Sequence, residues 1–238
     1  MFQHTKRLGY FDPNWEGRES VSIFGKELWS ELPSDVRWSF ESQAQSLTFK
    51  RGDAIYRQGD SPSGMYFVKR GLVGLVIVAA QSGKEHLLRF FREGQFFGHR
   101  ALFSEEGYHG STIALEATEL RFVPRDVILN ALGKHPELYR EVIQVLSKEL
   151  RRCETHQVMI LENQILGRIA QSLVYLKDIH PDHNWTRQEI ANFCASTVST
   201  VIKGMAKLEE MGLIEQEGRS VRLVDRDGLL ALVENDAL

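Results

Sequence analysis

WTRQEIANFCASTVSTVIKGMAKLEEMGLIEQEGRSVRLV, residues 185–224, contains the pattern of two short helices followed by a β-hairpin. Thr186 and Glu189 form a capping box, in which each side chain accepts a backbone N–H at the start of a helix. Ile190, Ala191 and Phe193 supply the apolar face of that helix. The stretch therefore predicts a short amphipathic helix with a well-defined beginning.

A second helix is expected directly after the first. Ala195 lies where a tight turn would fall, and Ser196 is able to cap the next helix. The buried stripe would recur at spacings of three and four residues, at Val198, Val201, Met205 and Leu208. Gly212 would end this helix, because glycine readily takes the left-handed conformation that follows many helix C-termini.

The hairpin that follows completes the pattern of a winged helix-turn-helix. Strands are expected at 213–214 and 220–224, around a turn at 217–219. In this motif the second helix lies in the major groove of DNA, and its first residues contact base edges. A helical bundle that ends in a hairpin is the alternative, but the ordered series of helix, turn, helix, glycine and hairpin favours DNA binding.

Polar side chains of this motif are the candidate DNA contacts. Phosphate contacts set affinity and its salt dependence, whereas base contacts give specificity. Arg187, Lys203, Lys207 and Arg219 are the cations suited to either role. The full expected DNA-binding set is Thr186, Arg187, Gln188, Thr197, Ser199, Thr200, Lys203, Lys207 and Arg219.

The composition is typical of a globular protein. Hydrophobic residues make up 42% of the 238 residues, which is enough for a core in one or two domains. The net charge of -3 gives no sign of a nucleic-acid partner, so any basic face must be local. Cys153 and Cys194 are too few for a disulfide framework. Without a signal peptide or an apolar run of roughly 18 residues, we expect a cytoplasmic protein with no membrane partner.

Between Ser46 and Val123 the sequence changes to short β-rich runs. The runs are SLTFK, GMYFVKRG, LVGLVIVAA, HLLRFF and TELRFV, and glycine-containing turns such as RQGDSPSG and AQSGKE separate them. Closely spaced strands with such turns favour a jelly roll. The predicted fold class is α+β, with an N-terminal jelly-roll β-barrel, a long dimerisation helix and a C-terminal winged helix-turn-helix.

The region from Pro136 to about Lys177 is predicted to be helical, with a break around Gly167. A narrow stripe with spacings of four and three favours a homodimer seam over packing on the same domain. The expected seam residues are Leu146, Leu150, Cys153, Gln157, Ile160 and Gln164. The expected domains are an N-terminal extension (1–24), a sensor barrel (25–134), the dimerisation helix (135–166) and the winged helix-turn-helix (167–238).

Several motifs in this order resemble the Crp/Fnr superfamily of bacterial transcription regulators. They are GDAIYRQGDSPSGMYFVKRGLVGL, EGQFFGHRALFSEEGYHGSTIALEATEL, LGRIAQSL and TRQEIANFCASTVSTVIKGMAKLEEMGLI, and the resemblance runs from Leu47 to the C-terminus. It implies a cyclic-nucleotide-binding-like sensor domain and a parallel dimer helix. It also implies an activator that binds double-stranded promoter DNA as a homodimer and contacts RNA polymerase, and not an enzyme.

The effector site departs from the pattern of the cyclic-AMP-binding members. The resemblance puts His99 in the place of a ribose-binding glutamate and Gly110 in the place of a phosphate-binding arginine, while Ser111 remains. Cys153 and Glu154 replace the threonine and serine that meet the adenine. We therefore expect that cyclic AMP is not bound in the usual way. The predicted pocket contains Arg89, which could supply the missing cation, with Phe97, Gly98, His99, Arg100, Gly110, Ser111, Thr112, Cys153 and Glu154.

The recognition helix departs as well. Val198, Ser199 and Lys203 stand where the resemblance leads one to expect arginine, glutamate and arginine. Bidentate contacts from arginine to guanine are therefore lost at two places. We expect the target to differ from the usual palindrome of the family.

The sequence leaves the identity of the effector undecided. No cofactor is certain, and an unknown small-molecule effector or a regulator that needs none fits the sequence. An iron–sulfur cluster near the N-terminus is excluded because no cysteine precedes Cys153. A haem sensor could use His86, His99 or His109 as a ligand, and a metal enzyme on the jelly roll would need a His-x-His pair that is missing. A dimeric scaffold that has lost DNA binding is the remaining alternative.

Overall fold

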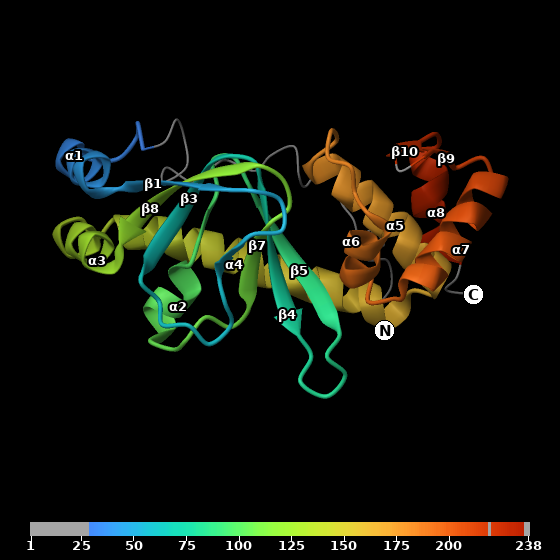
Figure 1. Cartoon of the computed structure of the whole chain (residues 1–238), viewed down its shortest axis with the longest axis horizontal. Helices are drawn as coiled ribbons and strands as arrows, with labels where there is room; N and C mark the ends of the chain where they lie inside the picture. The colour runs from blue at the N-terminus through green and yellow to red at the C-terminus, as the bar shows by residue number, and fades with distance from the viewer. Residues whose placement is uncertain (1–28, 219, 236–238) are drawn as a thin grey trace, which may run out of the picture. The chain divides into compact units, whose positions relative to one another are not determined.

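The structure is a computed structural model that describes residues 29–218 and 220–235 (Figure 1). The chain forms two compact units that divide between Glu149 and Leu150, inside helix α4 (Leu138–Glu162). The N-terminal extension expected at 1–24 lies outside the described residues. Within the described part of the chain, no helix has the length and apolar character needed to cross a membrane.

In the described part of the first unit, eight strands form two antiparallel sheets (Figure 1). One sheet has the order β1 (Gln45–Phe49), β8 (Thr118–Pro124), β3 (Gly64–Arg70) and β6 (Phe96–Phe97). The other has the order β2 (Ala54–Tyr56), β7 (Ser111–Ala114), β4 (Leu72–Val78) and β5 (Glu85–Arg92). This is the strand order of a jelly roll, so the predicted α+β fold with an N-terminal barrel is confirmed.

Aromatic side chains fill the space between the two sheets. Tyr66 and Phe97 stack with ring centroids 5.1 Å apart, and Phe91 stacks on Phe97 at 5.0 Å. Tyr56 and Tyr108 stack face to face at 3.6 Å. Each aromatic ring buries a large apolar area, so this cluster supplies a large part of the barrel core.

Helices α1 (Ser34–Gln43), α2 (His99–Ser104) and α3 (Arg125–Lys134) belong to the same unit. A second core lies among α1, α3, the start of α4 and the sheet, with members that include Trp29, Phe40, Phe67 and Leu132. Helix α3 was not expected from the sequence. It follows directly from β8, because Pro124 takes the N-cap position of the helix.

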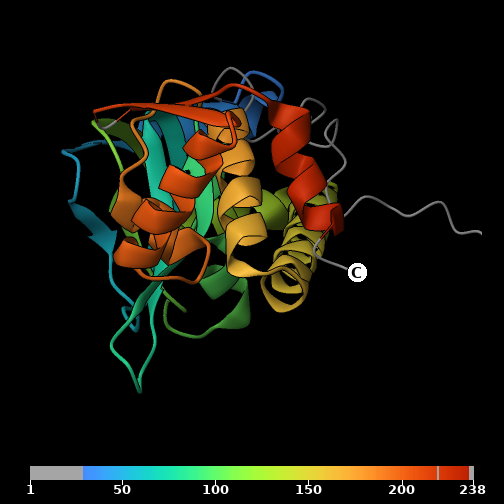
Figure 2. The same cartoon turned by 90° about the vertical axis from the view of Figure 1, so that its right-hand side faces the viewer.

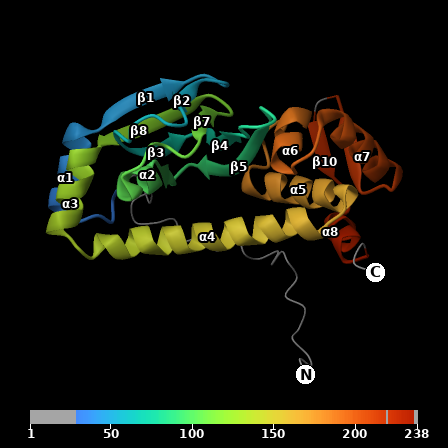
Figure 3. The same ribbon diagram turned by 90° about the horizontal axis from the view of Figure 1, so that it is seen from below.

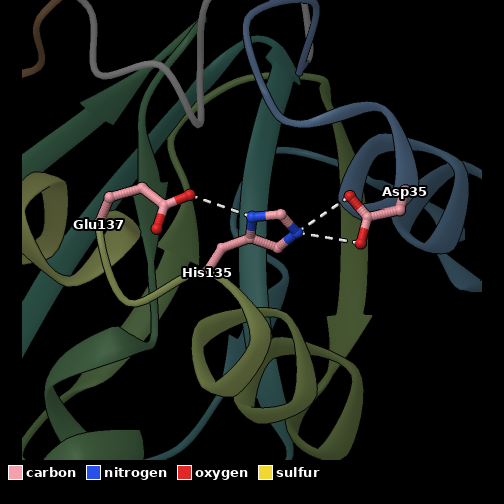
Figure 4. A network of polar contacts seen from close by, with 3 residues as sticks. All are labelled: Asp35, His135 and Glu137. Carbon is pink, nitrogen blue, oxygen red and sulfur yellow. Dashed lines mark hydrogen bonds and ion pairs between the residues drawn. The ribbon is translucent and has the colours of Figure 1, made fainter.

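A polar network ties α1 to the connection between α3 and α4 (Figure 4). The Nε2 atom of His135 lies 3.0 Å from both carboxylate oxygens of Asp35, and its Nδ1 atom lies 3.0 Å from Oε1 of Glu137. The hydrogen bond to Asp35, and then the one to Glu137, raise the pKa of His135. The same contact lowers the pKa of Asp35.

The second unit holds the remaining elements (Figure 2). They are α5 (Ile165–Ile179), α6 (Arg187–Phe193), α7 (Val198–Glu210), β9 (Ile214–Glu217), β10 (Ser220–Leu223) and α8 (Arg226–Asn235). The strands β9 and β10 pair antiparallel and form the expected wing. Helix α8 had not been predicted.

The break in the long helix differs from the prediction. Helix α4, seen along its length in Figure 3, ends at Glu162, and α5 begins at Ile165 with Gln164 as its N-cap. Gly167, where the break was expected, is buried inside α5. Gln164, predicted as the last seam residue, therefore lies outside α4.

Candidate nucleic-acid interface and effector region

The first helix of the DNA-binding motif begins as the sequence predicts. The Oγ1 atom of Thr186 accepts the backbone N–H of Glu189 at 3.1 Å. The backbone N–H of Thr186 donates in return to Oε2 of Glu189 at 2.8 Å. This reciprocal pair is a capping box and fixes the start of α6. The hydroxyl of Thr186, expected at the DNA, thus has a local structural role.

The turn between the two helices lies where the sequence predicts it, but a different residue caps the second helix. Ala195 has a positive φ of 54°, which makes the turn tight. The N-cap of α7 is Thr197, whose side chain accepts the N–H of Thr200. Ser196, the predicted cap, is buried before it. Gly212 follows the C-cap with a φ of 73°, as a glycine after a helix should.

The rotation of α7 about its axis is fixed by its buried stripe. Val201, Met205 and Leu208 are each 0% exposed. Gly204 lies against α5, where an added Cβ would come within 2.5 Å of Ile169 Cδ1. Because these contacts hold one side of α7 inward, the opposite side faces outward.

The outward face of α7 carries exposed residues at helical spacing, among them Ser199, Ile202, Lys203, Ala206, Lys207 and Glu210. Beside it, the Thr197 hydroxyl lies 3.0 Å from the Ser199 hydroxyl and 2.8 Å from that of Thr200. Lys207 lies 3.8 Å from Glu210. The predicted DNA contacts include polar members of this face but not Ile202, because its side chain offers no hydrogen-bonding group.

Arg187 joins the helix-turn-helix to the wing. Its Nη2 atom donates to Oε1 of Gln216 at 2.7 Å. Gln216 in turn donates from its backbone N–H and its side-chain amide to the carboxylate of Glu209, at 2.7 and 2.9 Å. Burial lowers the pKa of Arg187, and the charge of Glu209 opposes that effect. The Gln188 amide donates to Asn192 at 2.7 Å. Arg219 lies outside the described residues.

A buried ion-pair cluster occupies the expected effector region of the barrel. The Nη2 atom of Arg89, on β5, lies 2.7 Å from Oε1 of Glu149, on α4. The Nε2 atom of His99, at the start of α2, lies 3.3 Å from the same oxygen. The side chains of Arg89, His99 and Glu149 are 15%, 1% and 4% exposed. We call these three residues the Glu149 cluster.

The charges in this cluster outweigh the effect of burial on Glu149. Burial alone would raise the pKa of its carboxyl, but the contact with His99 and the charges of His99, Arg89 and Arg100 hold the pKa below its usual value. Glu149 is therefore ionised at neutral pH. Arg89, predicted as a cation that could receive an anionic ligand, already has a carboxylate partner.

The backbone is crowded at Gly110, the predicted place of a phosphate-binding arginine. A Cβ atom added to Gly110 would lie 2.8 Å from the carbonyl oxygen of Val76 and 2.9 Å from a side-chain carbon of Ile77. The Ser111 hydroxyl accepts the backbone N–H of Gln58 at 3.0 Å. Thr112 is fully buried. An arginine at position 110 would therefore need β4, which carries Val76 and Ile77, to move.

Each of the two units matches a known protein family. Residues 46–135 match the cyclic nucleotide-binding domain family. Residues 167–232 match the Crp-like helix-turn-helix domain family. The chain belongs to the Crp/Fnr superfamily of DNA-binding transcription regulators. It is thus a regulator and not an enzyme, as its relatives also indicate.

Relatives of this Crp/Fnr protein span most of its length. It is 28% identical, over 79% of this chain and 87% of the relative, to the CRP-like cAMP-activated global transcriptional regulator of Mycobacterium tuberculosis strain H37Rv. It is 27% identical to the transcriptional activator protein FnrA of Stutzerimonas stutzeri, over 77% and 78% of the two chains. The solved structure of a CRP/FNR-family transcriptional regulator from Thermus thermophilus is 28% identical, with a TM-score of 0.67 over 80% and 98% of the chains.

The structure brings only part of the predicted Crp/Fnr effector pocket together. Arg89 and His99 meet at Glu149, which was not among the residues predicted for the pocket. Cys153 and Glu154 are exposed residues of the second unit. The three candidate metal ligands differ in burial: His86 is half-buried, His99 is buried and His109 is exposed. Among the described residues, no group of three His, Cys, Asp or Glu side chains is placed to hold a metal ion.

Proposed function

We propose that this Crp/Fnr regulator is a homodimer that presents two copies of α7 to promoter DNA. We further propose that its barrel does not bind cyclic AMP in the usual way. The observation that carries the first statement is the fixed rotation of α7. Its apolar stripe is fully buried, so Ser199 and Lys203 face outward near the N-terminal end of the helix. The family membership adds a cytoplasmic location and contact with RNA polymerase to the proposal.

Homodimer formation is supported by apolar residues on the surface of α4. Tyr139, Ile143, Leu150 and Leu161 are 40%, 60%, 61% and 71% exposed. Their spacings of 4, 7 and 11 residues place them on one side of the helix. Of the predicted seam residues Leu146, Leu150, Cys153, Gln157 and Ile160, Leu150 belongs to this stripe, whereas Leu146 packs against the core of the first unit. A second copy of the same helix would cover the stripe in a two-fold interface.

The Glu149 cluster supports the proposal about the effector. The mycobacterial relative is named as cAMP-activated. In this chain Arg89 is paired with Glu149, and the arginine place at Gly110 cannot accept a side chain without a backbone shift. An anionic effector would have to displace a carboxylate that is already bound. The same cluster favours a second candidate, a regulator that needs no effector because Glu149 links α4 to the barrel by itself.

Gel-shift titrations with full-length protein test DNA binding. The probe is a duplex selected by the protein from a randomised pool, and the affinity is measured at several salt concentrations. We expect a steep loss of affinity with salt and a loss in Lys203→Ala that depends on the base sequence. Lys134→Ala, which removes an exposed cation from α3, is the matched control and should bind as the parent does. A protein that selects no duplex would contradict the proposal.

Titration calorimetry with cyclic AMP tests the effector. The proposal predicts no specific heat of binding, and duplex affinity that is the same with and without the nucleotide. Saturable binding that also raises duplex affinity would show that the barrel works as in a cAMP-activated regulator.

A further inference from the structure

Ile202 is an apolar side chain on the outward face of α7. It is 53% exposed, although the adjacent Val201 is 0% exposed. A single exposed isoleucine is common on protein surfaces and needs no explanation by itself. Its position near the N-terminal end of the helix, on the face that carries Ser199 and Lys203, gives it significance.

The neighbours of Ile202 let its side chain project. Ser199 and Ala206, which lie three residues before and four residues after it, are both small. The Ser199 hydroxyl also lies 3.0 Å from Thr197 at the helix cap. Ile202 therefore projects beyond these two neighbours on the outward face. Unlike Lys203 beside it, Ile202 has no group that can form a hydrogen bond.

The major groove offers one apolar group at the base edges, which is the C5 methyl group of thymine. The other edge groups are hydrogen-bond donors and acceptors, and covering one of them with an isoleucine without a partner costs free energy. The β-branched side chain is stiff in a helix, so little rotamer freedom is lost on contact.

We propose that Ile202 is a specificity-determining residue that recognises thymine through its C5 methyl group in each half-site. This inference rests on the proposed placement of α7 in the major groove. The contact selects thymine over cytosine at one base pair, because cytosine has no C5 methyl group for the apolar side chain to contact. Burial of one methyl group contributes about fourfold in affinity, or ~0.8 kcal/mol.

Replacement of thymine by deoxyuridine tests the contact, because it removes the methyl group and keeps the base pair. Full-length protein is titrated against its selected duplex and against versions in which each symmetric pair of thymines is replaced in turn. The variants are Ile202→Ala and the smaller β-branched Ile202→Val. Met211→Ala is the control, because Met211 is an exposed apolar residue at the other end of α7 (44% exposed). Circular dichroism confirms that each variant is folded.

We expect one symmetric replacement to weaken the binding of the parent by about fourfold per half-site. Ile202→Ala should bind both duplexes equally, Ile202→Val should keep part of the difference, and Met211→Ala should behave as the parent. Parent protein that binds tightly and specifically to every deoxyuridine duplex would overturn the inference, as would an Ile202→Ala variant that keeps the full difference. A parent that binds no duplex would instead overturn DNA binding itself, so the two failures are distinguishable.

Discussion

The Nη2 atom of Arg89 lies 2.7 Å from Oε1 of Glu149, and both side chains are largely buried between the barrel and α4. His99 adds a second contact to the same carboxylate. Three elements of the first unit, β5, α2 and α4, thus meet at one negative charge. The cluster is therefore positioned to set how this part of α4 lies on the barrel.

Removal of the Glu149 carboxylate should destabilise the protein. Glu149→Ala leaves the charge of Arg89 buried without its carboxylate partner, and leaves His99 without its contact. Loss of one partner of a buried ion pair lowers the free energy of unfolding by about 3–5 kcal/mol. Urea unfolding measures the change. Glu154→Ala, which removes an exposed carboxylate from the same helix, should change the free energy of unfolding by less than ~0.5 kcal/mol. Similar small effects of both variants would show that the cluster contributes little.

An arginine at position 110 should harm the fold rather than restore nucleotide binding. The added side chain would collide with the carbonyl of Val76, so we expect Gly110→Arg to lower the free energy of unfolding by about 1–3 kcal/mol or more. Gly133→Arg is the control, since nothing lies within 4 Å of the corresponding Cβ position on α3. A Gly110→Arg protein that is as stable as the parent and binds cyclic AMP would refute this account of the pocket.

A charge in the exposed stripe of α4 should separate the dimer. Leu150→Asp places a carboxylate at the proposed two-fold interface, whereas Arg151→Asp introduces the same side chain one residue further along the helix, away from the stripe. Sedimentation equilibrium should find monomers for the first variant and dimers for the parent and the second. Equal association of all three proteins would place the interface elsewhere.

The contact between His135 and Asp35 should make stability depend on pH. The folded pKa of His135 is raised above 6.5, so its contribution is fully present below pH 6.5 and is lost as the pH rises through the folded pKa. The folded pKa of Asp35 is lowered below 3.8, so its contribution is present above pH 3.8 and is lost as the pH falls through the folded pKa. Melting temperatures measured across this range should decline on the alkaline side in the parent and less so in His135→Asn. Parallel curves for the two proteins would argue against the contact.

The sequence predicted features whose causes are local. The capping box of Thr186 and Glu189 and the end of α7 at Gly212 depend on residues within one turn, and both are present. The jelly roll was predicted from five long runs. The strands β2, β6 and β7 were missed because two to four residues are too few for a period to show.

Features that depend on distant residues could not be predicted. Glu149 has the appearance of a surface residue on an amphipathic helix, and only the fold brings Arg89 and His99 to it. The break after Glu162 contains neither proline nor glycine, so the helical pattern runs through it. Ile202 was missed for a chemical reason, because candidate DNA contacts were sought among polar side chains.

Hydroxyl-radical footprinting of the full-length protein on its selected duplex tests whether a two-fold pair of chains places two copies of α7 in the major groove. We expect two symmetric protected regions whose centres are about 34–36 Å apart, one helical turn or a multiple of it. Lys203→Ala should weaken both regions together. A single protected region, or protection that does not change in Lys203→Ala, would show that α7 is not placed in this way.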